Sequence, residues 1–201
     1  MDSPAPAPAA APTPGKVAAM LTFQFALFTV VGALLWRLSG RDLADFVRAD
    51  PREFVQGLLL GGMMIVVAWG CFRWFPRLSE RLVRMQAPGY SFFRGKFGWP
   101  LVVLVSVGAG VGEEALFRGG VQTLLGDYVG IPAAILIASA LFGLVHRSKP
   151  LIMAVIVLIG ALFGTLFAWT GSLLTVMVAH AIYDVFALHY LLQEMRRLGL
   201  S

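Results

Sequence analysis

Three short groups of residues in this sequence combine acidic, basic or imidazole side chains with long apolar surroundings. They are Glu113, Glu114 and Arg118, then Phe142 and His146, and finally His180 and Asp184. A charged side chain inside a bilayer is costly, so each group is a candidate functional site. Carboxylates and imidazoles are the groups that bind and release protons in acid–base catalysis. Together the three groups predict one polar site inside a helical bundle, able to hold and activate a water molecule.

The first group contains two adjacent glutamates that differ in their partners. Each residue of an α-helix turns by about 100°, so Glu114 and Arg118 share a face and can form an ion pair. Glu113 points about 100° away and lacks that partner. A carboxylate without a cationic partner in a poorly hydrated site takes up a proton readily, as a general base must. The spacing therefore nominates Glu113 for chemistry and the other two residues for support, with an interfacial charge cluster as the alternative.

The other two groups also repeat at the spacing of one helical turn. Phe142 and His146 share a face, and His180 and Asp184 share a face within an otherwise apolar stretch. The alternatives are a structural histidine at a helix end and a structural His–Asp pair that joins two helices. His189 lies on the opposite side of its helix from His180 and is expected to be interfacial.

The elements that position these residues follow from the composition. Of the 201 residues, 58% are hydrophobic and only 13% are charged, and the mean hydropathy is +0.79. Such a chain excludes a soluble globular domain, a disordered chain and a nucleic-acid-binding module, because soluble domains are about 25% charged. The net charge of +5 comes from Lys and Arg beside apolar stretches, where they act as topology signals. The single cysteine, Cys71, excludes an intrachain disulfide.

The apolar stretches predict an all-α, polytopic membrane bundle of about six transmembrane helices. Most have the roughly 17–25 residues that a crossing needs, and the fourth is shorter. The predicted spans are 17–36, 54–75, 99–117, 131–146, 151–170 and 173–192. The expected organisation is a disordered Pro/Ala-rich tail at 1–15, N-terminal transmembrane helices with basic interfacial segments at 16–96, and a catalytic helical core at 97–195.

Basic residues predict the orientation of this bundle. They concentrate between the second and third spans, between the fourth and fifth, and after the sixth, which places both termini in the cytoplasm. The protein is thus expected to be a multi-pass protein of the cell (inner) membrane, and residues 77–86 to form an interfacial helix with a basic face. Small residues at four-residue spacing predict close helix packing. These pairs are Gly57 and Gly61, Gly108 and Gly112, and Gly160 and Gly164.

The order and spacing of the three groups resemble the CPBP family of intramembrane proteases. This family is also called the CAAX-protease and bacteriocin-processing family, or Abi and Rce1-like. The resemblance rests on Glu113-Glu114-x-x-x-Arg118, Phe142-x-x-x-His146 and His180-x-x-x-Asp184, each at the expected place in a predicted span. It covers about residues 99–192 and implies an all-helical bundle with a conical cavity that hydrolyses peptide bonds.

The resemblance also implies a role for each site residue. Glu113 activates the water with the help of His146, and His180 with the residue at 184 stabilises the tetrahedral oxyanion. The neighbouring glutamate–arginine pair holds the site together. Many family members have Asn at the last position, where this chain has Asp184, and an ionised aspartate repels an oxyanion. Asp184 is therefore expected to be protonated, to orient His180, or to help bind a metal.

The sequence leaves alternatives open for both the cofactor and the function. Two histidines with carboxylates also make a catalytic zinc set, so zinc held by Glu113, His146, His180 and Asp184 competes with a metal-free, glutamate-dependent mechanism. The expected function is an intramembrane endopeptidase that acts on a peptide or protein at the lipid bilayer. A non-catalytic family member with a binding or bacteriocin-immunity role stays open. So does a proton-coupled transporter, because buried acids and histidines suit proton relays.

Overall fold

The structure is a computed structural model that describes residues 13–90 and 98–200 of the chain. Most of the predicted tail at 1–15 lies outside the described residues. Its last part contributes to the first helix instead, because the Thr13 side chain accepts a hydrogen bond from the backbone of Lys16 and Pro14 begins the helix. Pro is favourable in a first helical turn, where its missing N–H costs nothing.

Helices make up nearly all of the described chain, and it contains no strand, which confirms the all-α prediction. The α-helices are α1 (Pro14–Leu38), α2 (Pro51–Trp74), α3 (Pro76–Tyr90), α4 (Trp99–Glu114), α5 (Thr123–Val129), α6 (Ile131–Val145), α7 (Pro150–Thr170) and α8 (Leu173–Arg197). A short 3-10 turn, η1 (Leu43–Asp45), follows α1, and a π-helix, η3 (Ala115–Gln122), joins α4 to α5.

Five helices are long and apolar enough to cross a membrane in the described part of the chain. They are α1, α2, the continuous helix Trp99–Val129, α7 and α8. The fourth predicted span corresponds to α6, which has 15 residues and is therefore shorter than a simple crossing requires. The chain is thus a multi-pass membrane protein with a helical bundle.

The third span is longer than the predicted 99–117 and extends to Val129. Polar residues lower the hydropathy of its second half, but their side chains have partners. Thr123 donates from its hydroxyl to the carbonyl of Arg118. Arg41 forms two hydrogen bonds with the carboxylate of Asp127, at 2.7 and 2.9 Å. Hydropathy does not reflect such contacts, so the predicted span ended too early, at residue 117.

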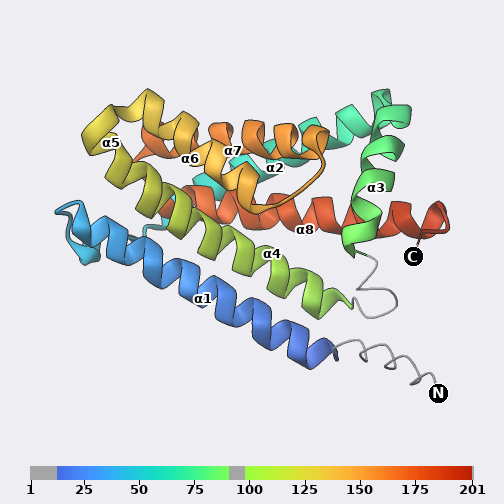
Figure 1. The fold of residues 1–201 in the computed structure, drawn as a ribbon, viewed down its shortest axis with the longest axis horizontal. Helices are drawn as coiled ribbons and strands as arrows, with labels where there is room; N and C mark the ends of the chain where they lie inside the picture. Colours follow the sequence, from blue (N-terminus) through green and yellow to red (C-terminus); the bar gives the residue numbers. More distant parts are fainter. Residues whose placement is uncertain (1–12, 91–97, 201) are drawn as a thin grey trace, which may run out of the picture.

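Helix α8 lies at the centre of the bundle (Figure 1). It packs along α2 and α4 and also contacts α3, α7 and η3. On the other side of α4, α1 runs along α4 and η3, while α6 and α7 form a hairpin that also contacts η3. The fully buried residues Ala115, Phe163, Val176 and Ala179 belong to one core cluster at the meeting point of η3, α7 and α8.

Close packing at the three predicted glycine pairs is confirmed. A Cβ atom at Gly57 or Gly61 would press into α8, against Val178 or the backbone of Ala179. The second pair, Gly108 and Gly112, faces Phe25 of α1, and the third, Gly160 and Gly164, faces Phe142, Ser139 and Gln122. Small residues let the helix axes approach closely. This packing matters in a bilayer because the hydrophobic effect does not drive helices together there.

Gly32 on α1 lies against the first turn of η3. A Cβ atom here would overlap the backbone carbonyl of Ala115, which no side-chain adjustment relieves. We expect Gly32→Ala to lower the free energy of unfolding by about 1–3 kcal/mol, the usual cost of overpacking. Gly62 on α2 has open space around it, so Gly62→Ala is the matched control and should stabilise by about 0.5–1 kcal/mol. Thermal melts in detergent compare the two, and equal melting temperatures would contradict this packing.

Candidate active site

The two glutamates of the site lie at the end of α4, where the helix changes from α to π geometry. Glu113 and Glu114 are the last residues of α4, and η3 begins at Ala115. A π-helical insertion in a longer α-helix is rare and is frequent at functional sites. It changes the direction of the following side chains, including that of Arg118, relative to the glutamates.

Glu114 and Arg118 form the predicted ion pair. The Arg118 Nη1 atom is 3.1 Å from Oε1 of Glu114, and the two side chains are 1% and 0% exposed. Arg118 also donates from Nη2 to the backbone carbonyl of Gly160 at 2.8 Å, which ties η3 to α7. Its guanidinium lies over the rings of Phe142 and Phe163, at 4.7 and 5.8 Å from their centroids. The charges are therefore buried with both hydrogen bonds and cation–π contacts.

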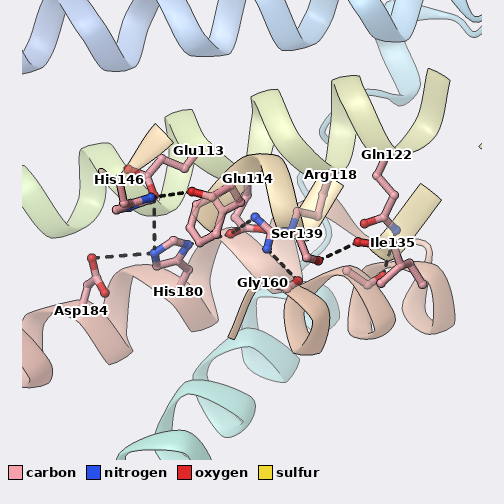
Figure 2. Close-up of polar contacts among 12 residues, drawn as sticks. Glu113, Glu114, Arg118, Gln122, Ile135, Ser139, His146, Gly160, His180 and Asp184 are labelled. Carbon is pink, nitrogen blue, oxygen red and sulfur yellow. Dashed lines mark hydrogen bonds and ion pairs between the residues drawn. The ribbon is translucent and has the colours of Figure 1, made fainter. Parts of the chain in front are cut away.

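His180 lies at the centre of the acidic residues (Figure 2). Its Nδ1 atom is 2.7 Å from Oε1 of Glu114, and because a carboxylate only accepts, Nδ1 carries the hydrogen. Its Nε2 atom is 4.0 Å from Oε2 of Glu113 and 3.7 Å from Oδ2 of Asp184. The imidazole also stacks on Phe163, with 4.9 Å between the ring centroids. Glu114 thus fixes the orientation of His180, so that Nε2 faces the other two carboxylates.

Glu113 differs from Glu114 as predicted. Its carboxylate has no arginine partner in the described chain, and its side chain is 14% exposed, compared with 0% for Glu114. The nearby basic group is the Nε2 atom of His180. Glu113 is therefore the more accessible and less strongly paired of the two carboxylates.

His146 is the C-cap residue of α6 and joins the same cluster. Its Nδ1 atom is 2.7 Å from the carbonyl oxygen of Phe142, and a carbonyl only accepts, so Nδ1 donates. In the neutral ring Nε2 is then the unprotonated nitrogen, available as a base. The ring packs edge-to-face on Phe142, and His146 lies within electrostatic range of Asp184. All seven predicted site residues are thus brought together from α4, η3, α6 and α8.

Gln122 is a buried residue of this region that the sequence prediction missed. It donates from Nε2 to the carbonyl of Gly164 at 2.9 Å. Arg118 and Gln122 stand four residues apart on η3, and their acceptors, Gly160 and Gly164, stand four residues apart on α7. One sequence signal could have identified Gln122: it is a glutamine in a membrane span that faces a row of small residues.

Tyr90 is a second residue that the prediction missed. It ends α3 and is half-buried against the cluster formed with α8. Burial, together with the charges of Asp184 and Glu113, raises the pKa of Tyr90 to about 12. Its hydroxyl therefore keeps its proton at neutral pH and lies within electrostatic range of the site. No pattern in the sequence of α3 indicates this, because the contact is between distant elements.

Comparison with known proteins places the chain in a family. Residues 95–186 match the family model described as type II CAAX prenyl endopeptidase Rce1-like. The chain is also 30% identical over 149 residues to the uncharacterized protein YpbD of Bacillus subtilis (strain 168), which covers 74% of each chain. The chain belongs to the Rce1-like family. No solved structure matches it.

The Rce1-like match spans every residue of the cluster, from Glu113 to Asp184. It does not reach α1 and α2, although YpbD is similar over a longer part of the chain. The Rce1-like family is a family of proteases, so this chain is a membrane-embedded member of a protease family with a peptide or protein substrate.

The predicted zinc set consists of side chains in this same cluster. In the described residues, no group of three His, Cys, Asp or Glu side chains is arranged to hold a metal ion. Nδ1 of His180 is engaged by Glu114 and Nδ1 of His146 by a backbone carbonyl. A shared zinc needs ligand atoms at about 2.0–2.2 Å from the ion. These Nδ1 contacts leave Nε2 of both histidines open, so zinc held by Glu113, His146, His180 and Asp184 stays a prediction, and the proposed reaction uses no metal.

A separate groove of about 420 Å³ lies between α2 and α7. It is lined by Gln56, Leu59, Leu60, Trp169 and Thr170, none of which was predicted for the site.

Proposed function

We propose that this protein is an intramembrane endopeptidase that hydrolyses a peptide bond of a membrane-associated peptide or protein through a water activated by Glu113. One observation carries the proposal. Within the described residues Glu113 has no arginine partner and faces Nε2 of His180, whereas Oε1 of Glu114 is engaged by both Arg118 and Nδ1 of the same histidine. Two neighbouring carboxylates with such different environments divide into a reactive group and a supporting group.

The reaction begins with proton transfer from water to the carboxylate of Glu113. The water oxygen attacks the carbonyl carbon of the peptide bond, and negative charge develops on the carbonyl oxygen. His180 in its imidazolium form donates from Nδ1 to Glu114 and presents Nε2–H to that oxyanion. The C–N bond then breaks as the leaving nitrogen receives a proton from Glu113, and His146 assists through its free Nε2. The products are a carboxylate and an amine.

Asp184 is proposed to orient His180 from the other side of the ring. Its Oδ2 atom is 3.7 Å from Nε2, close to the hydrogen-bond range but on the side where the oxyanion forms. Full ionisation there would oppose the developing charge, so Asp184 acts as a neutral or hydrogen-bonded group during attack.

Asp184→Asn is expected to keep cleavage within about tenfold of the wild type, which corresponds to about 1.4 kcal/mol in the barrier. The amide oxygen can take the same position, 3.7 Å from Nε2 of His180, without carrying charge. Asp184→Leu removes that interaction and is expected to lower the rate by roughly 10²–10³-fold. Initial cleavage rates of the two variants measure the difference. If the Asn variant is as inactive as the Leu variant, the carboxylate charge itself is required and the proposed role is wrong.

We further propose that the protein lies in the cell (inner) membrane with both termini in the cytoplasm. The support is the concentration of Arg and Lys on one side of the predicted spans. This orientation requires the short helix α6 to complete a sixth crossing, so that Arg147 and Lys149, which follow it, also face the cytoplasm. The substrate is then a peptide or protein segment that reaches the site from the bilayer or from the cytoplasmic surface.

Comparative mass spectrometry of peptide termini tests the proposed activity and reveals substrates. Membrane fractions are prepared from cells that express the wild type or Glu113→Gln at equal levels. We expect a set of new termini that is present with the wild type and absent with the variant. Identical termini in the two samples would contradict the proposal and favour a non-catalytic role, in which the variant retains its biological effect.

A further inference from the structure

Helix α3 has two faces of opposite character. Its buried face is formed by Ser79, Val83 and Ala87, spaced four residues apart, which pack against α8. The hydroxyl of Ser79 is 2.8 Å from that of Tyr190 on α8. The prediction of a helix at 77–86 is thus confirmed, and one face of it is fixed to the bundle.

The exposed face of α3 carries arginines that nearby carboxylates neutralise only in part. Arg84 pairs with Glu80 at 2.8 Å, and Arg197 at the end of α8 pairs with Glu194 at 2.7 Å. Within the described ranges, no carboxylate lies in ion-pair distance of Arg77 or Arg81. The same holds for the neighbouring Arg73 and Arg196. We call Arg77, Arg81 and Arg84 of α3, together with Arg73 in the last turn of α2, the basic face.

The position of the basic face is that of a membrane surface. Figure 1 shows α3 crossing the direction of α8 near the end of the bundle where the C-terminus lies. Large apolar side chains stand beside the arginines, and Trp74, Phe75 and Leu78 are 79%, 58% and 48% exposed. Aromatic residues beside arginines are typical of the interface between lipid tails and headgroups.

The geometry points to the basic face as a docking surface for the phosphate headgroups of anionic phospholipids. The guanidinium groups of Arg77 and Arg81, which have no carboxylate partner in the described chain, favour phosphate. The neighbouring Trp74 and Phe75 favour the acyl chains of the same molecules. A free phosphate ion satisfies only the first of these features, so the occupant is a lipid. Docked lipid also holds α3 against α8, which carries His180 and Asp184.

Melting temperatures of the purified protein in a neutral detergent test this surface without any cleavage assay. The additives are phosphatidylglycerol, phosphatidylcholine and inorganic phosphate, and the proteins are wild type and Arg77→Gln/Arg81→Gln. The control is Arg37→Gln/Arg52→Gln, which removes two exposed arginines outside the basic face. We expect phosphatidylglycerol to raise the melting temperature of wild type and control by about 5 °C, and that of the variant by less than half as much.

Three results would overturn the docking surface. They are an equal shift for variant and control, an equal shift with phosphatidylcholine, and a full shift with inorganic phosphate alone. The melting temperature of the variant without lipid shows whether it is folded, since exposed arginines contribute little to stability. Because no substrate is involved, the outcome is independent of the proposed protease activity.

Discussion

Arg118→Ala is expected to lower the free energy of unfolding by about 3–5 kcal/mol, the cost of removing one partner of a buried ion pair. The substitution leaves the fully buried Glu114 without its arginine and removes the hydrogen bond to the carbonyl of Gly160. It also removes the guanidinium from between the rings of Phe142 and Phe163. Thermal and denaturant melts in detergent measure the loss.

Two variants separate this effect from a general sensitivity to lost arginines. Arg84→Ala breaks the exposed pair with Glu80 on α3 and is expected to cost less than about 1 kcal/mol. Glu114→Gln combined with Arg118→Met removes both charges and should recover part of the stability lost in Arg118→Ala, because no uncompensated charge stays buried. If Arg118→Ala melts like Arg84→Ala, the buried pair does not hold η3 in place.

Glu113→Gln is expected to lower kcat by about 10²–10⁴-fold, the usual contribution of a general base. Glutamine has nearly the same shape but cannot accept the proton of water, so the packing of α4 is preserved while the first step fails. The melting temperature should change little, since Glu113 has no ion pair with an arginine of the described residues. Single-turnover cleavage of a peptide identified by terminal proteomics measures the rate.

His189→Gln is the matched control for that measurement. His189 lies on α8 like His180, but its ring stacks on Trp99 at 4.7 Å and it is not part of the polar cluster. We expect this variant to cleave at the wild-type rate. A Glu113→Gln variant that retains the control's rate would show that another group activates the water.

Much of the site could be predicted because its pairs repeat at one helical turn. Glu114 with Arg118 and His180 with Asp184 are local pairs, and an α-helix places residues four apart on one face. The unequal environments of Glu113 and Glu114 also followed from this geometry. The spans followed from apolar length, with the exception of α6, whose 15 residues fall short of a crossing.

Other features depend on contacts between distant elements or on a local change of helix type. The π-helix η3 shifts hydrogen bonding by one residue, and neither hydropathy nor spacing records such a shift. From the sequence, Arg118 was the one predicted partner of Glu114. In the structure the Glu114 carboxylate also accepts a hydrogen bond from Nδ1 of His180. Tyr90 comes into electrostatic range of the site through the packing of α3 on α8.

The central claim is hydrolysis through Glu113, and one incubation tests it most directly. Purified wild type and Glu113→Gln, both dialysed against a metal chelator, receive the same synthetic peptide in water enriched in ¹⁸O. We expect the wild type to cleave and to place one ¹⁸O atom in the new C-terminal carboxylate, while the variant yields at most about one-hundredth as much product. Equal product from both proteins, or loss of wild-type cleavage that returns only when metal is added, would contradict it.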